Sequence, residues 1–386
     1  MKHFKQIVSV MLTLLVIFSC CSSALAVAAE VQPEEKQYPI VYVTGFGTTN
    51  LYYADDPEKK SLFYPIDTDR ILGNLGNVGD YIMTSIINLE PDLLYTVLYE
   101  FLMDSCGMLS MGDDGKSPVD GVTVDPLTLN YEESGGGKYA FHYDFRLNPY
   151  DILPRLREHI AMVKEATGAE KVELVASSYG ATVAMTYLDE YKDDLDDIDS
   201  VLFCVPTLGG IDFLSEIFCD ELYVDPLAVQ DFVSGTIGAE GFGIYLSILD
   251  KAGLLDIIVQ ALLVPVLREA VLDALVAFAR DCVATIPAAW TCVRDKNFDK
   301  ALATMFGEDY ADENHKNAVL VEGVQKFRKN IMLRQTEIID QTIANYSDMH
   351  VAVISKYGSA PIPIGSDGDK MNDGLVTLES SSFGAT

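Results

Sequence analysis

One short stretch of the sequence combines a nucleophilic side chain with the surroundings that nucleophilic catalysis needs. Residues 172–176 have the pattern of a buried strand, Ser178 and Gly180 follow as Ser-x-Gly, and a helical pattern begins directly after them. A serine on a sharp strand-to-helix turn is held in a strained backbone conformation and needs small neighbours, which Ala176 and Gly180 supply. The helix N-terminus behind the serine stabilises developing negative charge. We therefore predict that Ser178 is a catalytic nucleophile, whereas Ser177 is in the wrong register.

A serine nucleophile that attacks an acyl group also needs two backbone N–H groups to hold the oxyanion. One normally comes from the residue after the nucleophile, here Tyr179, and the other from the loop after an earlier strand. The segment Gly45-Phe46-Gly47 follows such a strand-like run. We predict that the amide of Phe46 is the second donor, with Gly47 as the alternative. A glycine turn that only reverses the chain, and a chance Ser-x-Gly turn, are the competing interpretations.

The elements that must position these residues alternate along the first half of the chain. Runs typical of strands buried on both faces alternate with amphipathic helical patterns over 151–167 and after Gly180, and Gly168 is typical of a helix end. This alternation predicts an α/β fold with a central, mostly parallel sheet. The five strand-like runs are 39–44, 138–143, 172–176, 200–205 and 350–355.

The middle of the chain has few strand-like runs. From Ile211 to Asp348 long helical patterns dominate, and we predict a helical cap or lid inserted into the sheet domain. Ordinary core-facing helices are the alternative. The expected organisation is therefore a first part of the core over 29–210, the cap over 211–348 and a C-terminal part of the core over 349–386.

The N-terminus and the net charge indicate where the protein works. Lys2 and Lys5 precede an apolar run and small residues, which is typical of a secretory signal peptide ending near residue 28. The run is too short to favour a membrane span, and a lipoprotein acylated at Cys20 is a further alternative. The formal net charge of −31 repels phosphate backbones and makes a nucleic-acid function improbable.

Cysteine usage and ligand patterns bear on disulfides and metals. Five cysteines remain beyond the signal region, and an odd number leaves at least one thiol unpaired. Cys282 and Cys292 are close enough in sequence for a disulfide, and buried free thiols are the equally supported alternative. The sequence has no CxxC or HExxH pattern, so we expect neither a metal site nor a cofactor.

Several short motifs, taken in order, resemble those of the lecithin:cholesterol acyltransferase family. The resemblance spans nearly the whole chain after residue 28, although each motif is short, and the last motif is also similar to the acid loop of bacterial triacylglycerol lipases. The motifs are Pro39-Ile40-Val41-Tyr42-Val43-Thr44-Gly45-Phe46-Gly47, Tyr143-Asp144-Phe145-Arg146, Ala176-Ser177-Ser178-Tyr179-Gly180, Pro206-Thr207-Leu208-Gly209-Gly210 and Asn372-Asp373-Gly374-Leu375-Val376.

The resemblance implies an α/β-hydrolase fold with a cap and lid, a Ser-Asp-His triad and lipid ester substrates. Asp373 matches the catalytic acid of the family. The chain departs from the pattern at Ser177, where the family usually has His, and at Phe145, where it has Trp. No histidine follows Asp373 in the sequence, so we expect the natural chain to continue beyond Thr386.

None of the five histidines stands where the family has its catalytic base. His3 lies in the signal region, and His159 and His315 are interpreted as structural or surface residues. His142, beside the Tyr143 motif, and His350, at the start of a strand, are the two substitutes worth testing.

The leading hypothesis is a secreted lipase or O-acyltransferase that acts on lipid esters through an acyl-enzyme and makes transient contact with lipid surfaces through its cap. The alternatives are a catalytically inactive α/β-hydrolase-like binding protein and an esterase for small soluble substrates.

Overall fold

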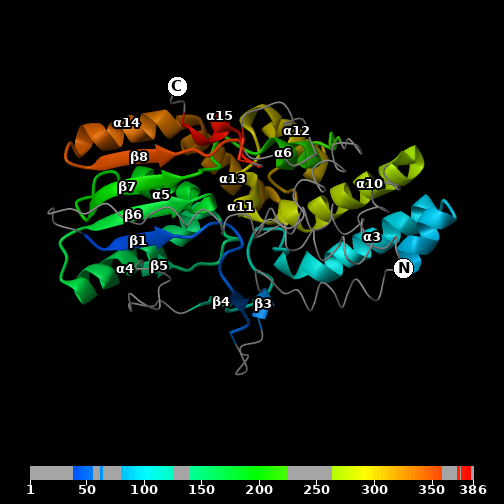
Figure 1. Ribbon diagram of the computed structural model, residues 1–386, viewed down its shortest axis with the longest axis horizontal. Coiled ribbons are helices and arrows are strands. Elements are labelled where there is room, and N and C mark those ends of the chain that lie inside the picture. The colour runs from blue at the N-terminus through cyan, green and yellow to red at the C-terminus, as the bar shows by residue number, and fades with distance from the viewer. Residues whose placement is uncertain are drawn as a thin grey trace.

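A five-stranded parallel sheet forms the centre of the protein (Figure 1). The computed structural model describes residues 38–54, 61–63, 80–125, 139–223, 263–358, 372–373 and 375–383. The expected signal peptide over 1–28 lies outside these residues. The strand order is β5-β1-β6-β7-β8. The strands are β1 (Ile40–Val43), β5 (Tyr139–Phe141), β6 (Val172–Ser177), β7 (Ile198–Cys204) and β8 (His350–Ile354).

All five strand predictions are confirmed to within a few residues, and so is the parallel α/β arrangement. Each neighbouring pair in the sheet is parallel, so the carboxyl ends of all five strands meet at one edge. β1 pairs with β5 on one side and β6 on the other, and Val43 is level with Ala176. The turn after β1 therefore lies next to the turn after β6.

Three helices pack close to this sheet. α4 (Pro149–Thr167) is capped by the Asn148 side chain and ends at Gly168, whose φ of +67° is the left-handed conformation that glycine adopts readily. α5 (Tyr179–Glu190) follows β6 directly, and α14 (Gln335–Asn345) contacts both α5 and β8. The helices predicted over 151–167 and after Gly180 are thus confirmed.

A second group of helices lies beyond the carboxyl ends of the strands (Figure 1). α3 (Pro91–Cys106) and α10 (Pro265–Asp281) pack against each other, and α6 (Asp212–Phe218) contacts both α10 and α12 (Phe298–Phe306). α11 (Pro287–Trp290) and α13 (Ala318–Asn330) also belong to this group. None of the helices in the described ranges is long and apolar enough to cross a membrane.

A small antiparallel sheet of order β3-β2-β4 stands apart from the main sheet (Figure 1). Its strands are β2 (Leu51–Tyr52), β3 (Ser61–Phe63) and β4 (Thr123–Val124). The Asp125 carboxylate, just after β4, accepts hydrogen bonds from the Tyr52 hydroxyl at 2.7 Å and from the Asn50 side chain at 3.3 Å. These contacts tie the loop that follows β1 to a segment about 75 residues away.

The cysteines resolve the alternative that the sequence left open. Cys282 and Cys292 are both buried thiols, and the Cys282–Cys292 disulfide is not formed. Cys282 instead donates to the Cys106 carbonyl, and burial raises the pKa of its thiol to about 12. These cysteines serve mainly as small apolar side chains in the core.

Candidate active site around Ser178

The turn between β6 and α5 holds Ser178 in a strained backbone conformation. Its φ is +54° and its ψ is −120°, which is uncommon for a residue other than glycine. Its N–H donates to the Cys204 carbonyl at 2.9 Å, and its hydroxyl does not cap α5. The strand-to-helix turn predicted for Ser178 is therefore present, and strain of this kind is typical of functional sites.

Close backbone approach explains why glycine stands two residues later. A Cβ atom at Gly180 would lie 2.3 Å from the Val43 carbonyl oxygen and 2.6 Å from that of Thr44. The first turn of α5 therefore rests directly on the end of β1. This contact fixes the distance between the Ser178 turn and the Gly45–Gly47 loop.

Ser178 opens onto a narrow cavity of about 50 Å³. The side chains that line this cavity are mostly apolar. They come from the loop after β1, the start of α5, the loop after β7, α6, the residues around α11 and the C-terminal segment. Ser178 itself is only 9% exposed. The lining residues are Phe46, Ser178, Tyr179, Thr207, Ile211, Leu214, Val283, Ala289, Cys292 and Leu375.

The two residues predicted to donate to an oxyanion line this same cavity. Phe46 comes from the loop after β1, and Tyr179 is the first residue of α5, where backbone N–H groups lack partners within the helix. Their rings meet edge to face at a centroid distance of 5.9 Å, and the Tyr179 hydroxyl donates to the Leu147 carbonyl at 2.8 Å. Gly47 has a φ of +70°, so it supplies the reversal of the chain beside Phe46.

Asp373 lies two residues from the cavity wall. Its Oδ1 accepts from the backbone N–H of Leu375 at 3.0 Å and of Val376 at 2.7 Å. Leu375 contributes its side chain to the cavity that Ser178 lines. The structure thus brings the Asp373 segment to the cavity, although Asp373 itself is not part of the lining.

The histidines differ in their position relative to the carboxyl edge of the sheet. His350 pairs with Ser200 at the amino ends of β8 and β7, so it lies at the opposite edge from Ser178 and is excluded as its base. His159 is buried, and its Nε2 lies 3.2 Å from the Tyr139 carbonyl. His315 is held by the Asn317 N–H at 3.1 Å, between α12 and α13. Among the histidines that the structure describes, His142 alone follows the carboxyl end of a strand of the main sheet.

The environment of His142 predicts a pH dependence of stability. Its Nδ1 is buried without a hydrogen-bond partner among the described residues. Burial lowers its pKa below 6.5, Arg155 lowers it further, and Asp125 opposes both. As the pH falls through 6.5, the unfolded chain takes up a proton that the folded protein resists, so the free energy of unfolding decreases. Replacing His142 by Gln should therefore reduce the loss of stability between pH 7 and pH 5.

Urea unfolding at both pH values measures this effect. His315→Gln is the matched control, because both ring nitrogens of His315 already have partners: Nδ1 accepts from the Asn317 N–H and Nε2 lies 4.0 Å from the Asp309 carboxylate. An unchanged pH slope in His142→Gln would contradict the prediction.

The Tyr143-Asp144-Phe145-Arg146 motif packs against Phe46, one of the residues that line the cavity. The Arg146 side chain is fully buried and donates to both carboxylate oxygens of Asp144, at 2.9 and 2.7 Å. The Phe145 ring packs on Phe46 at a centroid distance of 4.7 Å. Phe145 thus packs against the residue predicted to help hold the oxyanion, even though the resemblance expects Trp at this position.

Sequence reasoning missed part of the cavity wall. Leu214, Val283, Ala289 and Cys292 carry no pattern that distinguishes them from other apolar core residues. Thr207 and Leu375, like Phe46, Ser178 and Tyr179, belong to motifs singled out in the sequence. The Thr207 hydroxyl accepts from the Cys292 thiol at 3.5 Å.

Comparison with models of known protein families, with curated proteins and with solved structures gives no match to this chain. Within the described residues, no group of His, Cys, Asp and Glu side chains could hold a metal ion.

Proposed function

We propose that the protein is a serine hydrolase or O-acyltransferase of the α/β-hydrolase fold that acts on lipid or other acyl esters, as its resemblance to the lecithin:cholesterol acyltransferase family implies. The observation that carries the proposal is Ser178 at a φ of +54° between β6 and α5, opening onto an apolar cavity. A strained serine at the carboxyl edge of a parallel sheet is the arrangement of a nucleophile elbow.

Each neighbouring group has a role in this chemistry. The Ser178 hydroxyl attacks the ester carbonyl, and the N–H groups of Phe46 and Tyr179 hold the oxyanion of the tetrahedral intermediate. The ester C–O bond then breaks, and the alcohol leaves with the proton that Ser178 has lost. Water or a second alcohol attacks the acyl-enzyme, and its proton returns to Ser178 as the acyl group is released. Asp373 takes the place of the triad carboxylate, and no described histidine is assigned as its partner.

The apolar wall suits an acyl group better than a polar one. Much of the wall consists of side chains that make no hydrogen bonds, namely Ile211, Leu214, Val283 and Leu375. A hydrocarbon chain can therefore bind against them without leaving a polar side chain unpaired. The described helices α6 and α11, which contribute Leu214 and Ala289 to the cavity wall, would then belong to a cap that shields the acyl-enzyme from water.

The volume of the cavity favours a second candidate within the same chemistry. A space of about 50 Å³ between the described residues accepts a short acyl group more readily than a long one. An esterase for small soluble esters is therefore the alternative, and a series of 4-nitrophenyl esters from acetate to palmitate separates the two. Rates that rise with chain length support the lipid ester proposal, and rates that fall support the small-ester esterase.

A fluorophosphonate probe tests whether Ser178 is reactive at all. The reagent should form a covalent adduct that mass spectrometry of proteolytic peptides assigns to Ser178, and none to the adjacent Ser177, which is 2% exposed. Labelling should be lost when the protein is first unfolded in urea. A folded protein that stays unlabelled at millimolar probe would overturn the proposal and favour an inactive binding protein.

A further inference from the structure

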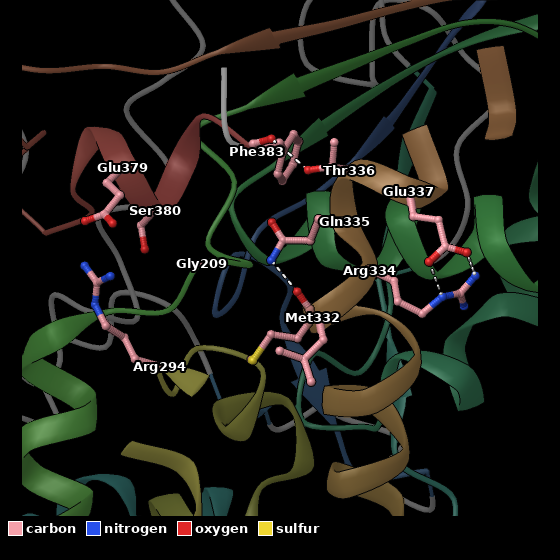
Figure 2. Close-up of a pocket in the computed structure, with 11 residues that line it drawn as sticks. Gly209, Arg294, Met332, Arg334, Gln335, Thr336, Glu337, Glu379, Ser380 and Phe383 are labelled. Atoms are coloured by element: carbon pink, nitrogen blue, oxygen red, sulfur yellow. Dashed lines mark hydrogen bonds and ion pairs between the residues drawn. The ribbon is translucent and has the colours of Figure 1, made fainter. Parts of the chain in front are cut away.

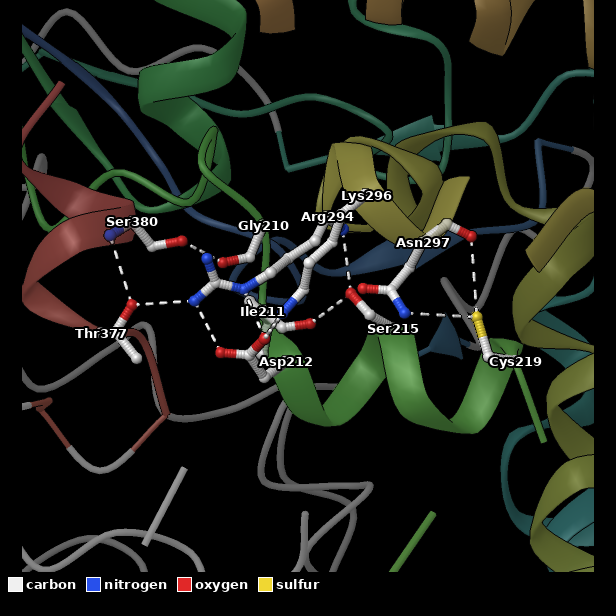
Figure 3. Close-up of polar contacts among 10 residues, drawn as sticks. All are labelled: Gly210, Ile211, Asp212, Ser215, Cys219, Arg294, Lys296, Asn297, Thr377 and Ser380. Atoms are coloured by element: carbon white, nitrogen blue, oxygen red, sulfur yellow. Dashed lines mark hydrogen bonds and ion pairs between the residues drawn. The ribbon is translucent and has the colours of Figure 1, made fainter. Parts of the chain in front are cut away.

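The segment that follows Asp373 is anchored by an arginine from a distant part of the chain. Arg294 Nη2 donates to the Thr377 hydroxyl oxygen at 3.0 Å (Figure 3). The same oxygen accepts from the Ser380 N–H at 3.2 Å, which caps the short helix α15 (Leu378–Ser381). Thr377 also pairs with Asn372, so the two ends of the turn that contains Asp373 are held together.

Arg294 is itself fixed by a buried carboxylate. Its Nε lies 2.5 Å from Asp212 Oδ1, and its Nη2 donates to Asp212 Oδ2 at 2.6 Å. The two side chains are 11% and 3% exposed. The hydrogen bonds to Asp212 and Thr377 both come from Arg294 Nη2, whose two hydrogens point in fixed directions in the plane of the guanidinium, and a lysine ammonium does not reproduce this pair of directions. Its backbone N–H also donates to Ser215 Oγ at 2.9 Å, which ties Arg294 to α6.

The loop after β7 fills the space between Arg294 and the C-terminal segment. Gly209 donates to the Ser380 carbonyl at 3.2 Å, and the Ser380 hydroxyl donates to the Gly210 carbonyl. A Cβ at Gly210 would lie 2.7 Å from the Cα of Arg294. Figure 2 shows Arg294, Gly209 and Ser380 around one side of an open pocket of about 310 Å³. Three segments distant in sequence therefore meet at Arg294.

We propose that Arg294 is a positioning residue, which holds Asp212 and Thr377 at once and thereby fixes Asp373 and Leu375 relative to Ser178. The proposal rests on the proposed function for its chemical consequence. Thr377 lies two residues from Leu375, whose side chain lines the cavity and whose N–H binds the Asp373 carboxylate. Loss of the Arg294 contact would let this segment shift away from Ser178, and misplacement of a catalytic group by about 1 Å costs on the order of a hundredfold in rate.

Two variants remove the contact in different ways. Arg294→Lys keeps the positive charge beside Asp212 but cannot hold both partners in the same geometry. Thr377→Val keeps the Arg294–Asp212 ion pair but removes the oxygen that accepts from both Arg294 and the Ser380 N–H, and Thr377→Ser restores it. Arg294→Lys leaves the Thr377 cap of α15 in place, so a loss shared by both variants is assigned to the Arg294–Thr377 contact. Lys296→Met is the matched control, because the Lys296 ammonium lies 3.6 Å from the same Asp212 carboxylate while its side chain is 68% exposed.

Two measurements on the full chain distinguish the anchoring of the Thr377 segment from the reactivity of Ser178. Hydrogen exchange reports on the amides of Leu375 and Val376, and the fluorophosphonate reaction reports on Ser178. In Arg294→Lys and Thr377→Val we expect exchange about tenfold faster and Ser178 modification about tenfold slower, whereas Thr377→Ser and Lys296→Met behave like the wild type. The melting temperature of each variant shows that it is folded.

The outcomes are distinct. Unchanged exchange in Thr377→Val overturns the anchoring role, and faster exchange with unchanged Ser178 modification overturns the positioning role. A wild-type protein that does not react with the probe overturns the proposed function and the chemical consequence of Arg294, while the exchange rates still decide whether Arg294 anchors the segment.

Discussion

Replacing Ser178 by Ala should lower the rate of ester hydrolysis by about a thousandfold or more and leave the protein folded. Removal of the nucleophile of a serine hydrolase eliminates the acyl-enzyme route, and the residual rate comes from binding and oxyanion stabilisation alone. Ser178 is 9% exposed at the edge of a cavity, so loss of its hydroxyl leaves the packing of the core unchanged. The measurement is kcat/KM for a 4-nitrophenyl ester, together with the melting temperature.

Ser177→Ala is the matched control for this experiment. It removes a hydroxyl from the neighbouring residue of β6, one position before the strained turn. We expect the activity of this variant to stay within a few-fold of the wild type. Equal losses in both variants would indicate a general disturbance of β6 and would contradict the nucleophile assignment.

Replacing Gly180 by Ala should destabilise the protein by about 3 kcal/mol or more. The added Cβ would lie 2.3 Å from the Val43 carbonyl oxygen, and both atoms belong to backbone that the sheet and α5 hold in place. Overpacking against fixed backbone costs about 1–3 kcal/mol and occasionally more, and here no flexible side chain can give way. The variant should also lose reactivity at Ser178, because relief of the clash moves the strained turn.

Gly168→Ala separates the steric effect from the loss of a glycine. Gly168 ends α4 with a φ of +67°, and a Cβ there meets no atom within 4 Å. Its replacement should cost only the left-handed conformation, about 1–2 kcal/mol. Urea unfolding compares the two variants, and a Gly180→Ala cost no larger than that of Gly168→Ala would refute the close-contact explanation.

The parts of this fold that local sequence determines were the parts that could be predicted. The strand before Ser178 and the helix after it follow from apolar runs of different period, and Gly168 marks the end of α4. The strained turn at Ser178 was predicted because such a turn needs small neighbours, and Ala176 and Gly180 supply them.

The parts that depend on distant packing could not be predicted. No local pattern shows that Arg294 meets Thr377, or that Val283 and Ala289 face Ser178, because these contacts join segments about 80 to 110 residues apart. The choice between a Cys282–Cys292 disulfide and free thiols likewise depended on where α10 and α11 place the two residues.

The contribution of Leu375 to the cavity has a consequence for biosynthesis. About 200 residues separate Leu375 from Ser178, so the wall beside the serine is incomplete until this late segment leaves the ribosome. At about 5–20 residues per second, this interval lasts roughly 10–40 s after Ser178 itself is made. The central strands β1, β5 and β6 can pair during that time, whereas the pocket beside the nucleophile closes only when the Leu375 segment folds back onto the loop after β7.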